Sequence, residues 1–432
     1  MKIAAIIAEY NPFHNGHLYQ IETLKKELSA DRIIIVMSGN FVQRGIPALI
    51  DKYQRTYMAL NNGADLVFEL PCYFALGSAE YFAQGAVALL DKLGVVDILH
   101  FGSECGNIDL LTDYAKRLVT ESDEYKTILN KYLKQGFSFP ISRSKALTEL
   151  YVNNKDILAN PNNILAIEYI KALLQRNSTI TPATLARKGS GYTSSDLSKG
   201  EFASANAIRK AIENLSSNGN PDSHSLNALQ EFIPESVYNC FISSINSNNF
   251  IPVFPDDFSA ILHYKLLSFT NENTNDFSVF YDVNEHLSNT LCNTLSDFTS
   301  FTDFALKCKS KNLTYTRISR CLMHILLDMK QDTIDILKDA DYIQYARLLG
   351  FSENGKDVFK LIKANSSIPI ITKPSKALKD LNGIALTSLK TDINASNIYQ
   401  SVYFNKGNLA KASLKPKNEL RSEIIKIKAS GT

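Results

Sequence analysis

The sequence lacks the features that would place it in a secreted or a membrane class. Its six cysteines are scattered, with no CxxC pair and no regular spacing, so we expect reduced thiols and no structural zinc site. No apolar run approaches the roughly 18 to 20 residues that span a bilayer, and we expect no membrane partner. The first residues lack the long apolar stretch and the cleavage site of a signal peptide. These absences predict a cytoplasmic protein.

An excess of charge of one sign is also missing, because 46 Lys and Arg residues stand against 44 Asp and Glu, for a net charge of +2. Such a balance neither indicates nor excludes a nucleic-acid partner, since binding depends on where basic residues cluster. The length of 432 residues suggests two or three domains, each able to bury its own core. It leaves the oligomeric state open.

The first pattern along the chain is a series of short apolar runs, at residues 2–8 and beginning at Asp31, Asp65 and Val95. Unbroken apolarity rich in Ile and Val is typical of strands buried on both faces. Segments 16–30, 51–63 and 78–94 between these runs show helical spacing, and the last two end at a glycine. The alternation predicts an α/β fold: a Rossmann-like, doubly wound parallel sheet. The ligand crevice of such a sheet lies beyond the carboxyl ends of its strands.

The chain divides by pattern into three parts. Residues 107–177 are predominantly helical in pattern and 179–189 read as a further strand, and we place the end of the first domain at residue 215. The following segment, 216–225, is rich in Ser, Asn, Gly and Pro and is the best linker candidate. Residues 216–366 are expected to form a mainly helical domain, and residues 367–432 a mixed, basic segment with a short strand candidate at 369–372.

Residues 11–21, "NPFHNGHLYQI", place two histidines three residues apart, directly after the first apolar run. The start of a helix favours anions through its unpaired N–H groups and its dipole. Gly16 lets a phosphate approach the backbone, and the imidazoles of His14 and His17 can donate hydrogen bonds to phosphate oxygens. The pattern therefore predicts binding of a nucleoside triphosphate.

Two other interpretations of the pair remain open from spacing alone. A histidine in a turn is often only a solvated turn residue. His-x-x-His could also be half of a metal site, although the nearby chain offers only Glu9 as an obvious further ligand. Phosphate binding is the interpretation that we favour.

The HNGH motif at the end of a first parallel strand resembles the signature of the nucleotidyltransferase superfamily. Further blocks, which run in order from the N-terminus to about residue 350, together resemble the bacterial tRNA(Met) cytidine acetate ligase family. These blocks are "AEYNPFHNGHLYQ", "VMSGNFVQRG", "NGADLVFELP", "FGSE", "NPNNILAIEYIKAL" and "RISRCLMHIL".

The resemblance implies an ATP-dependent ligase that forms acetyladenylate from acetate and releases pyrophosphate. The acetyl group would then pass to N4 of the wobble cytidine, position 34, of elongator tRNA(Met), giving N4-acetylcytidine. ATP, acetate and elongator tRNA(Met) are the implied partners. Mg²⁺ is expected to accompany ATP, because pyrophosphate departs with concentrated negative charge, but no dedicated set of carboxylate ligands stands out.

The resemblance also implies site residues. His14 and His17 are the expected catalytic residues, acting on the triphosphate and its transition state. At Gly102 the missing side chain would let the base or ribose lie against the backbone. For Asn163 a helix cap is the alternative, and for Arg187 a surface ion pair. The expected ATP-binding residues are Ile7, Ala8, Glu9, Tyr10, Asn11, Pro12, Phe13, His14, Asn15, Gly16, His17, Leu18, Tyr19, Gln20, Gly102, Asn163 and Arg187.

Other positions are weaker candidates. Ser204 and Arg209 resemble the serine-and-arginine phosphate motif of the wider superfamily. The loop at residues 37–45 could line the acetate or acceptor pocket, or could simply hold its own shape, through Ser38, Asn40, Gln43 and Arg44.

A tRNA acceptor requires clustered cations, and an aromatic side chain could stack on an unpaired anticodon base. Solvated surface residues are the alternative. The candidates are Lys307, Lys309, Lys311, Arg317 and Arg320 with Tyr315, and a basic tail of Lys406, Lys411, Lys415, Lys417, Arg421, Lys426 and Lys428.

Two rival functions remain. One is an adenylyltransferase that acts on a small phosphorylated acceptor, and the other is a noncatalytic RNA-binding protein. The large helical second half favours a macromolecular acceptor over the first, and the intact HNGH motif argues against the second.

Overall fold

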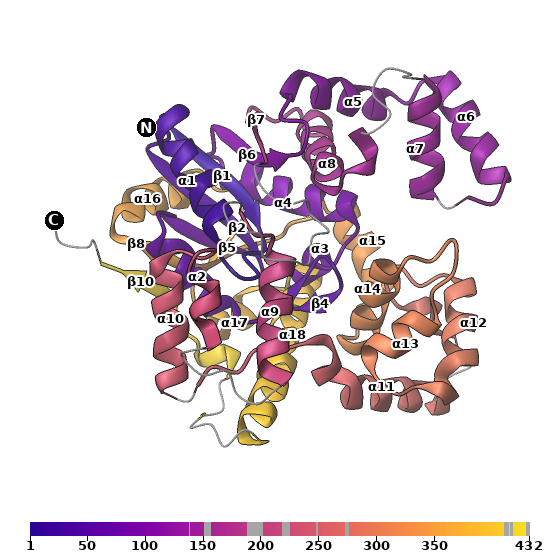
Figure 1. Cartoon of the computed structure of the whole chain (residues 1–432). Helices are drawn as coiled ribbons and strands as arrows, with labels where there is room; N and C mark the ends of the chain where they lie inside the picture. Colours follow the sequence, from indigo (N-terminus) through magenta and orange to yellow (C-terminus); the bar gives the residue numbers. More distant parts are fainter. Residues whose placement is uncertain are drawn as a thin grey trace.

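A computed structural model of the chain describes residues 1–137, 139–150, 157–187, 202–217, 225–247, 249–272, 276–409, 414 and 418–428. Its centre is a mixed sheet in the order β10-β8-β5-β2-β1-β6-β7, with β9 paired to β8 (Figure 1). The strands are β1 (Ile3–Ala8), β2 (Arg32–Ser38), β5 (Leu66–Leu70), β6 (Ile98–Ser103), β7 (Thr181–Ala186), β8 (Ala346–Ser352), β9 (Ile370–Ile371) and β10 (Ile425–Ile427), with β3 (Phe41–Val42) and β4 (Ile46–Pro47) in a separate hairpin.

The predicted doubly wound sheet is confirmed. Strands β5, β2, β1, β6 and β7 are parallel neighbours. The chain builds outward from β1 through β2 to β5, and then returns to the other side of β1 to form β6 and β7. The order therefore reverses between β1 and β6, and a crevice is expected beyond the carboxyl ends of these two strands.

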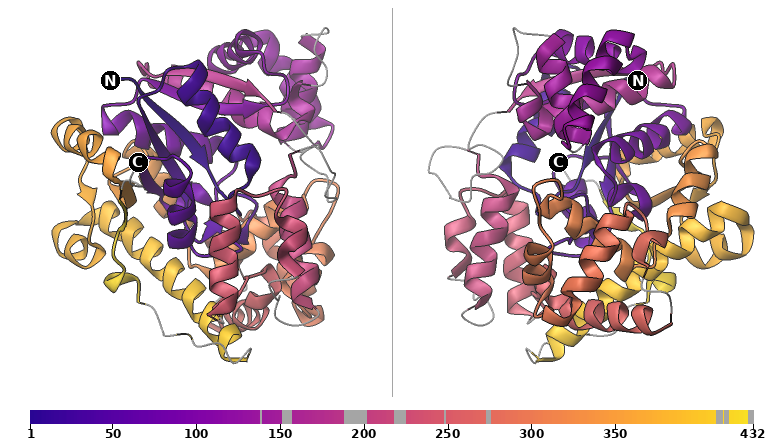
Figure 2. Two further views of the ribbon diagram at one scale, coloured as in Figure 1. Left: turned by 60° about the vertical axis from the view of Figure 1, so that its left-hand side comes forward. Right: turned by 90° about the vertical axis from the view of Figure 1, so that its right-hand side faces the viewer.

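Helices cover both faces of the sheet, as Figure 2 shows, because the strands alternate their buried side chains between two cores. Ala4 and Ile6 of β1 face the core packed by α1, α2, α9 and α10, whereas Ile3 and Ala5 face the core packed by α3, α4, α5 and α8. The bounds are α1 (Asn15–Glu27), α2 (Lys52–Asn61), α9 (Ala205–Ser217), α10 (Glu235–Asn246), α3 (Cys72–Ala75), α4 (Ala79–Leu93), α5 (Ile108–Thr120) and α8 (Pro161–Gln175).

The segment 216–366, expected to be mainly helical, also contains the strand β8, which the sequence pattern did not predict. This strand pairs antiparallel with β5, and β10 of the basic tail then pairs parallel with β8. A short buried apolar run fits a helix or a strand equally well, and the free edge of β5 decides the outcome. The strand candidate at 369–372 is confirmed as β9. The division into three domains stays a prediction, and the sheet takes strands from all three parts.

Two helical lobes project from this body on the right of Figure 1. The upper lobe is a hairpin of α6 (Asp123–Lys134) and α7 (Phe139–Leu150). The lower lobe holds α11 (Ser259–Glu272), α12 (Glu285–Thr294), α13 (Phe301–Lys307), α14 (Tyr315–Leu326) and α15 (Gln331–Asp339), and the remaining helices are α16 (Lys356–Asn365), α17 (Pro374–Asp380) and α18 (Gly383–Leu409). Within the described ranges, no helix is both long and apolar enough to cross a bilayer.

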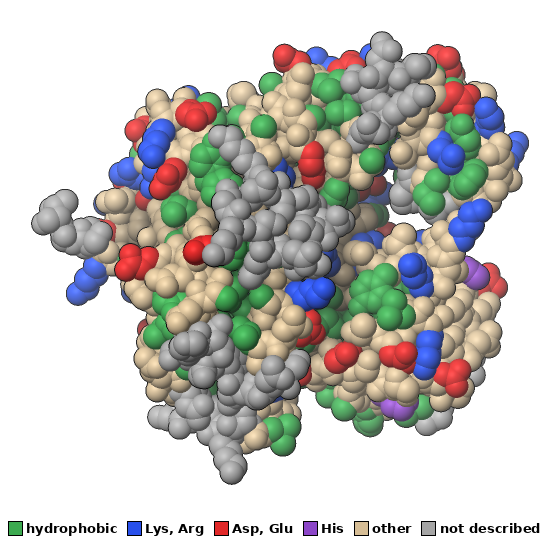
Figure 3. Space-filling view, in the orientation of Figure 1, with side chains coloured by type: hydrophobic (Ala, Val, Ile, Leu, Met, Phe, Trp, Pro, Cys, Tyr) green, Lys and Arg blue, Asp and Glu red, His purple; other side chains and the backbone are tan. Residues whose placement is uncertain are grey.

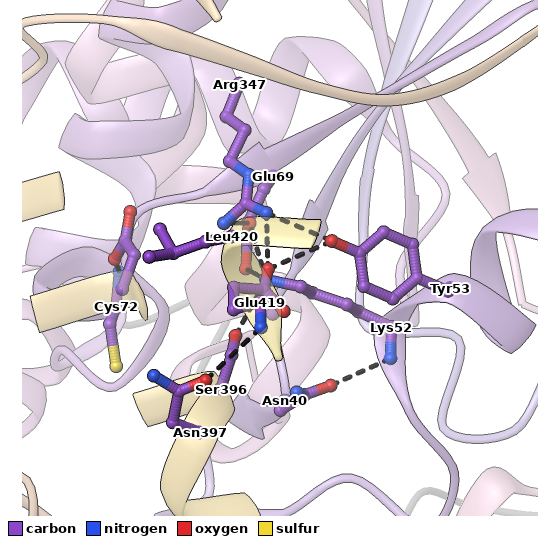
Figure 4. A network of polar contacts seen from close by, with 12 residues as sticks. Asn40, Lys52, Tyr53, Glu69, Cys72, Arg347, Ser396, Asn397, Glu419 and Leu420 are labelled. Atoms are coloured by element: carbon purple, nitrogen blue, oxygen red, sulfur yellow. Dashed lines mark hydrogen bonds and ion pairs between the residues drawn. The ribbon is translucent and has the colours of Figure 1, made fainter. Parts of the chain in front are cut away.

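A buried cluster of charges joins parts of the chain that are distant in the sequence (Figure 4). The Lys52 ammonium lies 2.7 Å from a carboxylate oxygen of Glu69 and 2.7 Å from one of Glu419. Arg347 pairs with the same two carboxylates, and all four side chains are at most 5% exposed. Burial alone would raise the pKa of Glu419, but the two cations lower it to about 2. The cluster joins α2, β5 and β8 to the tail.

Candidate active site

A crevice opens at the carboxyl ends of β1 and β6, where the topology places it. Its wall combines the first motif with the loop after β2, the end of β6, the start of α8 and the start of α9. The predicted residues that line it are Ile7, Ala8, Glu9, Tyr10, Asn11, His14, His17, Gln20, Gln43, Arg44, Gly102, Arg187, Ser204 and Arg209. A smaller adjoining cavity adds Gly16 and Tyr19.

The two histidines are fixed by the backbone at the start of α1. His14 is the N-cap, and its Nδ1 accepts a hydrogen bond from the Gly16 amide at 3.1 Å. His17 Nδ1 accepts one from the His14 amide at 3.2 Å, and the two rings stack with centroids 3.7 Å apart. Because each Nδ1 accepts, a neutral ring carries its proton on Nε2. The pair therefore offers two N–H donors, each with its tautomer set by the helix cap.

Both rings are neutral at physiological pH. Burial, together with the charges of Arg187 and Arg209, lowers the pKa of His14 to about 3. Burial, His14 and Arg187 lower the pKa of His17 well below its ordinary value. The crevice thus pairs uncharged hydrogen-bond donors with two permanent cations, an arrangement suited to polyphosphate oxygens.

Four predicted residues support the motif from behind without lining the crevice: Pro12, Phe13, Asn15 and Leu18. Phe13 is fully buried, and its ring lies 4.8 Å from that of Tyr10. The Asn15 side chain donates to the Glu231 carbonyl at 2.9 Å. The resemblance implied that the whole segment 7–20 contacts ATP, and the structure separates its lining from its supporting positions.

Asn163 lies in a reciprocal latch between the end of β6 and the start of α8. Its Oδ1 accepts hydrogen bonds from the amides of Glu104 and Cys105 at 3.0 and 3.1 Å. In return, the Glu104 carboxylate accepts from the amides of Asn162 and Asn163 at 3.2 and 2.8 Å. The side chain that lines the crevice is the neighbouring Asn162. The cap of α8 thus comes from Glu104, and Asn163 holds the strand end in place.

Gly102 and Arg187 face each other across β6 and β7. A Cβ atom at position 102 would lie 3.3 Å from Cγ of Arg187, so the glycine leaves room for the arginine stem. Arg187 follows β7 directly and forms no ion pair with a described acidic residue. The structure places it in the wall of the crevice, in contrast to the surface ion pair considered above.

Sequence reasoning missed Arg55, which organises the loops on which the crevice depends. This fully buried side chain donates to the carbonyls of Glu9 and Ser38 at 2.6 and 3.0 Å, where β1 and β2 end. It also donates to the carbonyl of Ile50 at 3.1 Å. Burial lowers its pKa to about 10. One feature of the sequence could have identified it: Arg55 lies on the same helix face as Met58 and Ala59, which are buried.

Sequence reasoning also missed the apolar wall. The lining residues that it missed include Phe82, Phe101, Asn162, Leu165 and Tyr169. Four of these five are apolar or aromatic residues in elements that pack the core, where their spacing looks the same as that of ordinary core positions.

Glu9 is the one acidic residue among the described residues that line the crevice. Its carboxylate accepts from the Gln43 amide at 3.0 Å. No group of three or more His, Cys, Asp or Glu side chains suited to a metal ion occurs in the described part of the chain. The residues present therefore fit a nucleotide that carries its own cation better than a resident metal.

Some of the expected tRNA-binding cations are held in ion pairs, whereas others are exposed to solvent. Lys307 pairs with Asp303 at 2.7 Å, and Arg317 and Arg320 both pair with Asp282, whereas Lys309 and Lys311 are exposed. Lys406 pairs with Asp257. The other tail cations that are described, Arg421, Lys426 and Lys428, are exposed, and Lys411, Lys415 and Lys417 lie outside the described residues.

Helix α14, which carries Arg317 and Arg320, lies directly against the crevice loop. The Ser319 hydroxyl donates to the Gly45 carbonyl at 2.7 Å. A Cβ atom on Gly45 would lie 2.2 Å from the Arg320 amide nitrogen, and Gly45 has a φ of 74°, so this contact requires glycine. Tyr315 at the start of α14 is partly buried.

Comparison with known proteins agrees with this geometry. Residues 1–413 match the sequence model of a family described as HIGH Nucleotidyl Transferase, which defines the class of the protein. The chain is 41% identical over 405 residues to the tRNA(Met) cytidine acetate ligase of Clostridium novyi, covering 93% of this chain and 96% of that protein. It is 43% identical over 407 residues to the ligase of the same name from Thermoanaerobacter sp., covering 94% and 96%.

Two solved structures of Thermotoga maritima TmcAL are similar over the whole fold. The apo form has a TM-score of 0.88 and the form bound to alpha-thio ATP a TM-score of 0.85. In each comparison the identity is 30%, and the match covers 99% of this chain and 100% of the solved chain. The chain belongs to the tRNA(Met) cytidine acetate ligase family.

Proposed function

We propose that the protein is an ATP-dependent ligase that acetylates N4 of the wobble cytidine, position 34, of elongator tRNA(Met). Acetate would attack the α-phosphorus of ATP, giving acetyladenylate and pyrophosphate, and the cytidine amine would then displace AMP. The relatives' shared name and the ATP analogue bound by TmcAL support this assignment. A cytoplasmic location follows from the proposed tRNA substrate.

The observation that carries the proposal is the neutral histidine pair beside Arg187 and Arg209. Acetate is already ionised at neutral pH, so the first step needs positioning and charge stabilisation rather than a strong base. The Nε2–H groups of His14 and His17 would donate to phosphate oxygens as negative charge moves toward pyrophosphate. The two guanidinium groups would oppose the growing charge.

The other residues that we propose to contact ATP are among those that line the crevice. Gly102, Arg187, Gln20 and the β1 end, Ile7 to Asn11, would surround the nucleotide, since all of them line the crevice. We keep Asn163 as a residue that places this wall through its latch with Glu104. Mg²⁺ would arrive bound to the triphosphate, and Glu9 is the one described carboxylate that lines the crevice.

One assay tests the proposal. The protein is incubated with ATP, labelled acetate and total tRNA, and label in N4-acetylcytidine of tRNA is the expected result. Pyrophosphate release that depends on a small phosphorylated acceptor would support an adenylyltransferase instead. Tight tRNA binding without either reaction would indicate a noncatalytic RNA-binding protein, and both of these outcomes would overturn the assignment.

A further inference from the structure

The tips of the two helical lobes touch each other although more than 170 residues separate them in the sequence. The Asn312 side chain donates to the Gly136 carbonyl at 2.9 Å. The Lys311 ammonium lies 5.6 Å from the centre of the Phe137 ring. Figure 3 shows the surface hollowed between the two lobes. The contact joins the α6–α7 turn to the α13–α14 loop as a bridge beside the body of the protein.

Both sides of the bridge include a stretch of sequence that carries positive charge and no negative charge. Residues 125–148 hold Lys126, Lys131, Lys134, Arg143 and Lys145 without an Asp or Glu, and residues 304–327 hold Lys307, Lys309, Lys311, Arg317 and Arg320, again without an acid. Several of these ten are used in ion pairs with acids elsewhere. Four exposed lysines near the contact have no acidic partner within the described ranges: Lys134, Lys145, Lys309 and Lys311.

Aromatic rings lie among these lysines. Lys145 is 4.9 Å from the centre of the Phe137 ring and 5.4 Å from that of Tyr132. Phe139, at the start of α7, is 50% exposed, although its ring would be more stable if covered. Lysines without acidic partners, together with aromatic side chains of which one is exposed, are a combination that binds single-stranded nucleic acid, through base stacking and phosphate contacts.

Each side of the bridge is also fastened to the wall of the crevice. Arg143 of α7 forms an ion pair with the buried Glu168 of α8, and α8 supplies Asn162, Leu165 and Tyr169 to the lining. On the other side, α14 is bonded through Ser319 to the loop that carries Gln43 and Arg44. A single strand of nucleic acid bound to the bridge would therefore lie beside the crevice.

We infer that the bridge is a binding platform for the unpaired loop of the RNA substrate, formed by Lys134, Phe137, Phe139, Lys145, Lys309 and Lys311. This inference rests on the proposed function and extends RNA binding to the α6–α7 hairpin, which belongs to the predicted catalytic domain. The lysines of both lobes hold the phosphates of one loop, and Phe139 stacks on one of its bases.

The test compares charge-matched variants of the full-length protein. The first pair is Lys134→Gln with Lys145→Gln, and the second is Lys309→Gln with Lys311→Gln. The control is Lys360→Gln with Lys363→Gln on α16, on the opposite side of the molecule in Figure 1. The control is well matched because both lysines are exposed and Lys363 lies 4.4 Å from the Phe359 ring centre.

Each platform pair is expected to weaken tRNA binding roughly tenfold and to reduce the salt dependence of log K by about 1.4, for two phosphate contacts to a single strand. Phe139→Ala is expected to weaken binding about fivefold or more without changing the salt slope, because stacking releases no counterions. Acetate-dependent ATP–pyrophosphate exchange stays within about twofold of the unaltered protein in every variant, since the variants leave the crevice intact.

Three outcomes overturn the platform: platform variants that bind tRNA as tightly as the unaltered protein, an equal loss in the α16 control, or a parallel loss of pyrophosphate exchange. If the unaltered protein acetylates tRNA and the platform variants bind normally, the platform is wrong and the proposed function stands. If the unaltered protein acetylates no tRNA, the proposed function itself fails.

Discussion

We propose two separable roles for His14, because its two ring nitrogens act on different partners. Nδ1 caps α1 through the Gly16 amide, and Nε2 is left to donate into the crevice. An asparagine at this position can supply the cap, because its side-chain oxygen accepts from the same amides, but it lacks the second donor. The residue therefore allows stability and catalysis to be tested apart.

We expect His14→Asn to keep the stability of the fold and to lower acetyladenylate formation by about 10²- to 10³-fold, the usual effect of removing one donor to a developing charge. His14→Ala should lower activity equally and also cost about 1 kcal/mol through the lost cap. Acetate-dependent ATP–pyrophosphate exchange measures the first effect, and urea unfolding measures the second. Near-normal exchange in both variants would remove His14 from the reaction.

The pH dependence of the same step follows from the neutral pair. Because the pKa of His14 is about 3, kcat/KM for ATP should show no histidine ionisation between about pH 5.5 and 8. Stability behaves differently: an unfolded histidine binds a proton near its ordinary pKa of 6.5, and the native ring does so only near 3. The pair therefore destabilises the native state progressively as pH falls from about 6.5 toward 3. A rate inflection near pH 6.5 that His14→Asn removes would contradict this.

At the scale of elements, the sequence predicted the strands that are buried on both faces and the helices between them. The runs that became β1 and β2 are rich in Ile, those that became β5 and β6 are mixed apolar runs, and α4 ends as expected at Gly94, whose φ is 69°. It did not predict β8 or β10, because short strands on this side of the sheet are selected by the strands that they pair with and not by their own pattern. Local sequence thus specified the centre of the sheet and left its far edge open.

The latch between β6 and α8 gives a test at the same scale. Asn163→Ala leaves the amides of Glu104 and Cys105 without their acceptor, so it should lower the free energy of unfolding by about 1–3 kcal/mol. Asn162→Ala removes a side chain from the crevice wall, so it should raise KM for ATP. It should lower the free energy of unfolding less than Asn163→Ala does. Thermal unfolding and ATP titration together measure both effects. The assignment is reversed if Asn162→Ala proves the more destabilising of the two.

At the scale of the whole molecule, the buried charge cluster makes the fold depend on its tail. Glu419→Gln leaves Lys52 and Arg347 short of one buried negative charge, and we expect a loss of about 3–5 kcal/mol. Glu423→Gln, an exposed neighbour on the same tail, is the control and should change stability by no more than about 0.5 kcal/mol.

The effect should also depend on pH. The pKa of Glu419 is about 2 in the native state against an ordinary 4.5, so its contribution is complete above about pH 4.5 and is lost as pH falls toward 2. Urea unfolding of Glu419→Gln and the unaltered protein should differ most at neutral pH and converge in acid. A constant difference across this range would show that the carboxylate charge is not what stabilises the cluster.

Site residues could be predicted from the sequence where their residue type is unusual in its local pattern. They could not be predicted where the same residue type is common in a protein core. Paired histidines around a glycine identified the crevice from the sequence, and Arg187 joins them there. Phe82 and Tyr169 gave no such signal, because aromatic side chains on packed helices are ordinary core residues. Arg55 could not be predicted for another reason. It donates hydrogen bonds to backbone carbonyls, and every residue has a carbonyl, so the sequence does not indicate these partners.

The antiparallel pairing of β8 with β5 has a consequence for synthesis on the ribosome. The nascent chain completes β5 at residue 70 but makes its partner only at residues 346–352, so some 275 codons must be translated in between. At the usual bacterial elongation rate, this interval lasts about 15 to 60 seconds. Throughout it the N-terminal half exposes an unpaired strand edge that could join a neighbouring polypeptide. Efficient production of the enzyme should therefore depend on chaperones that shield that edge until translation ends.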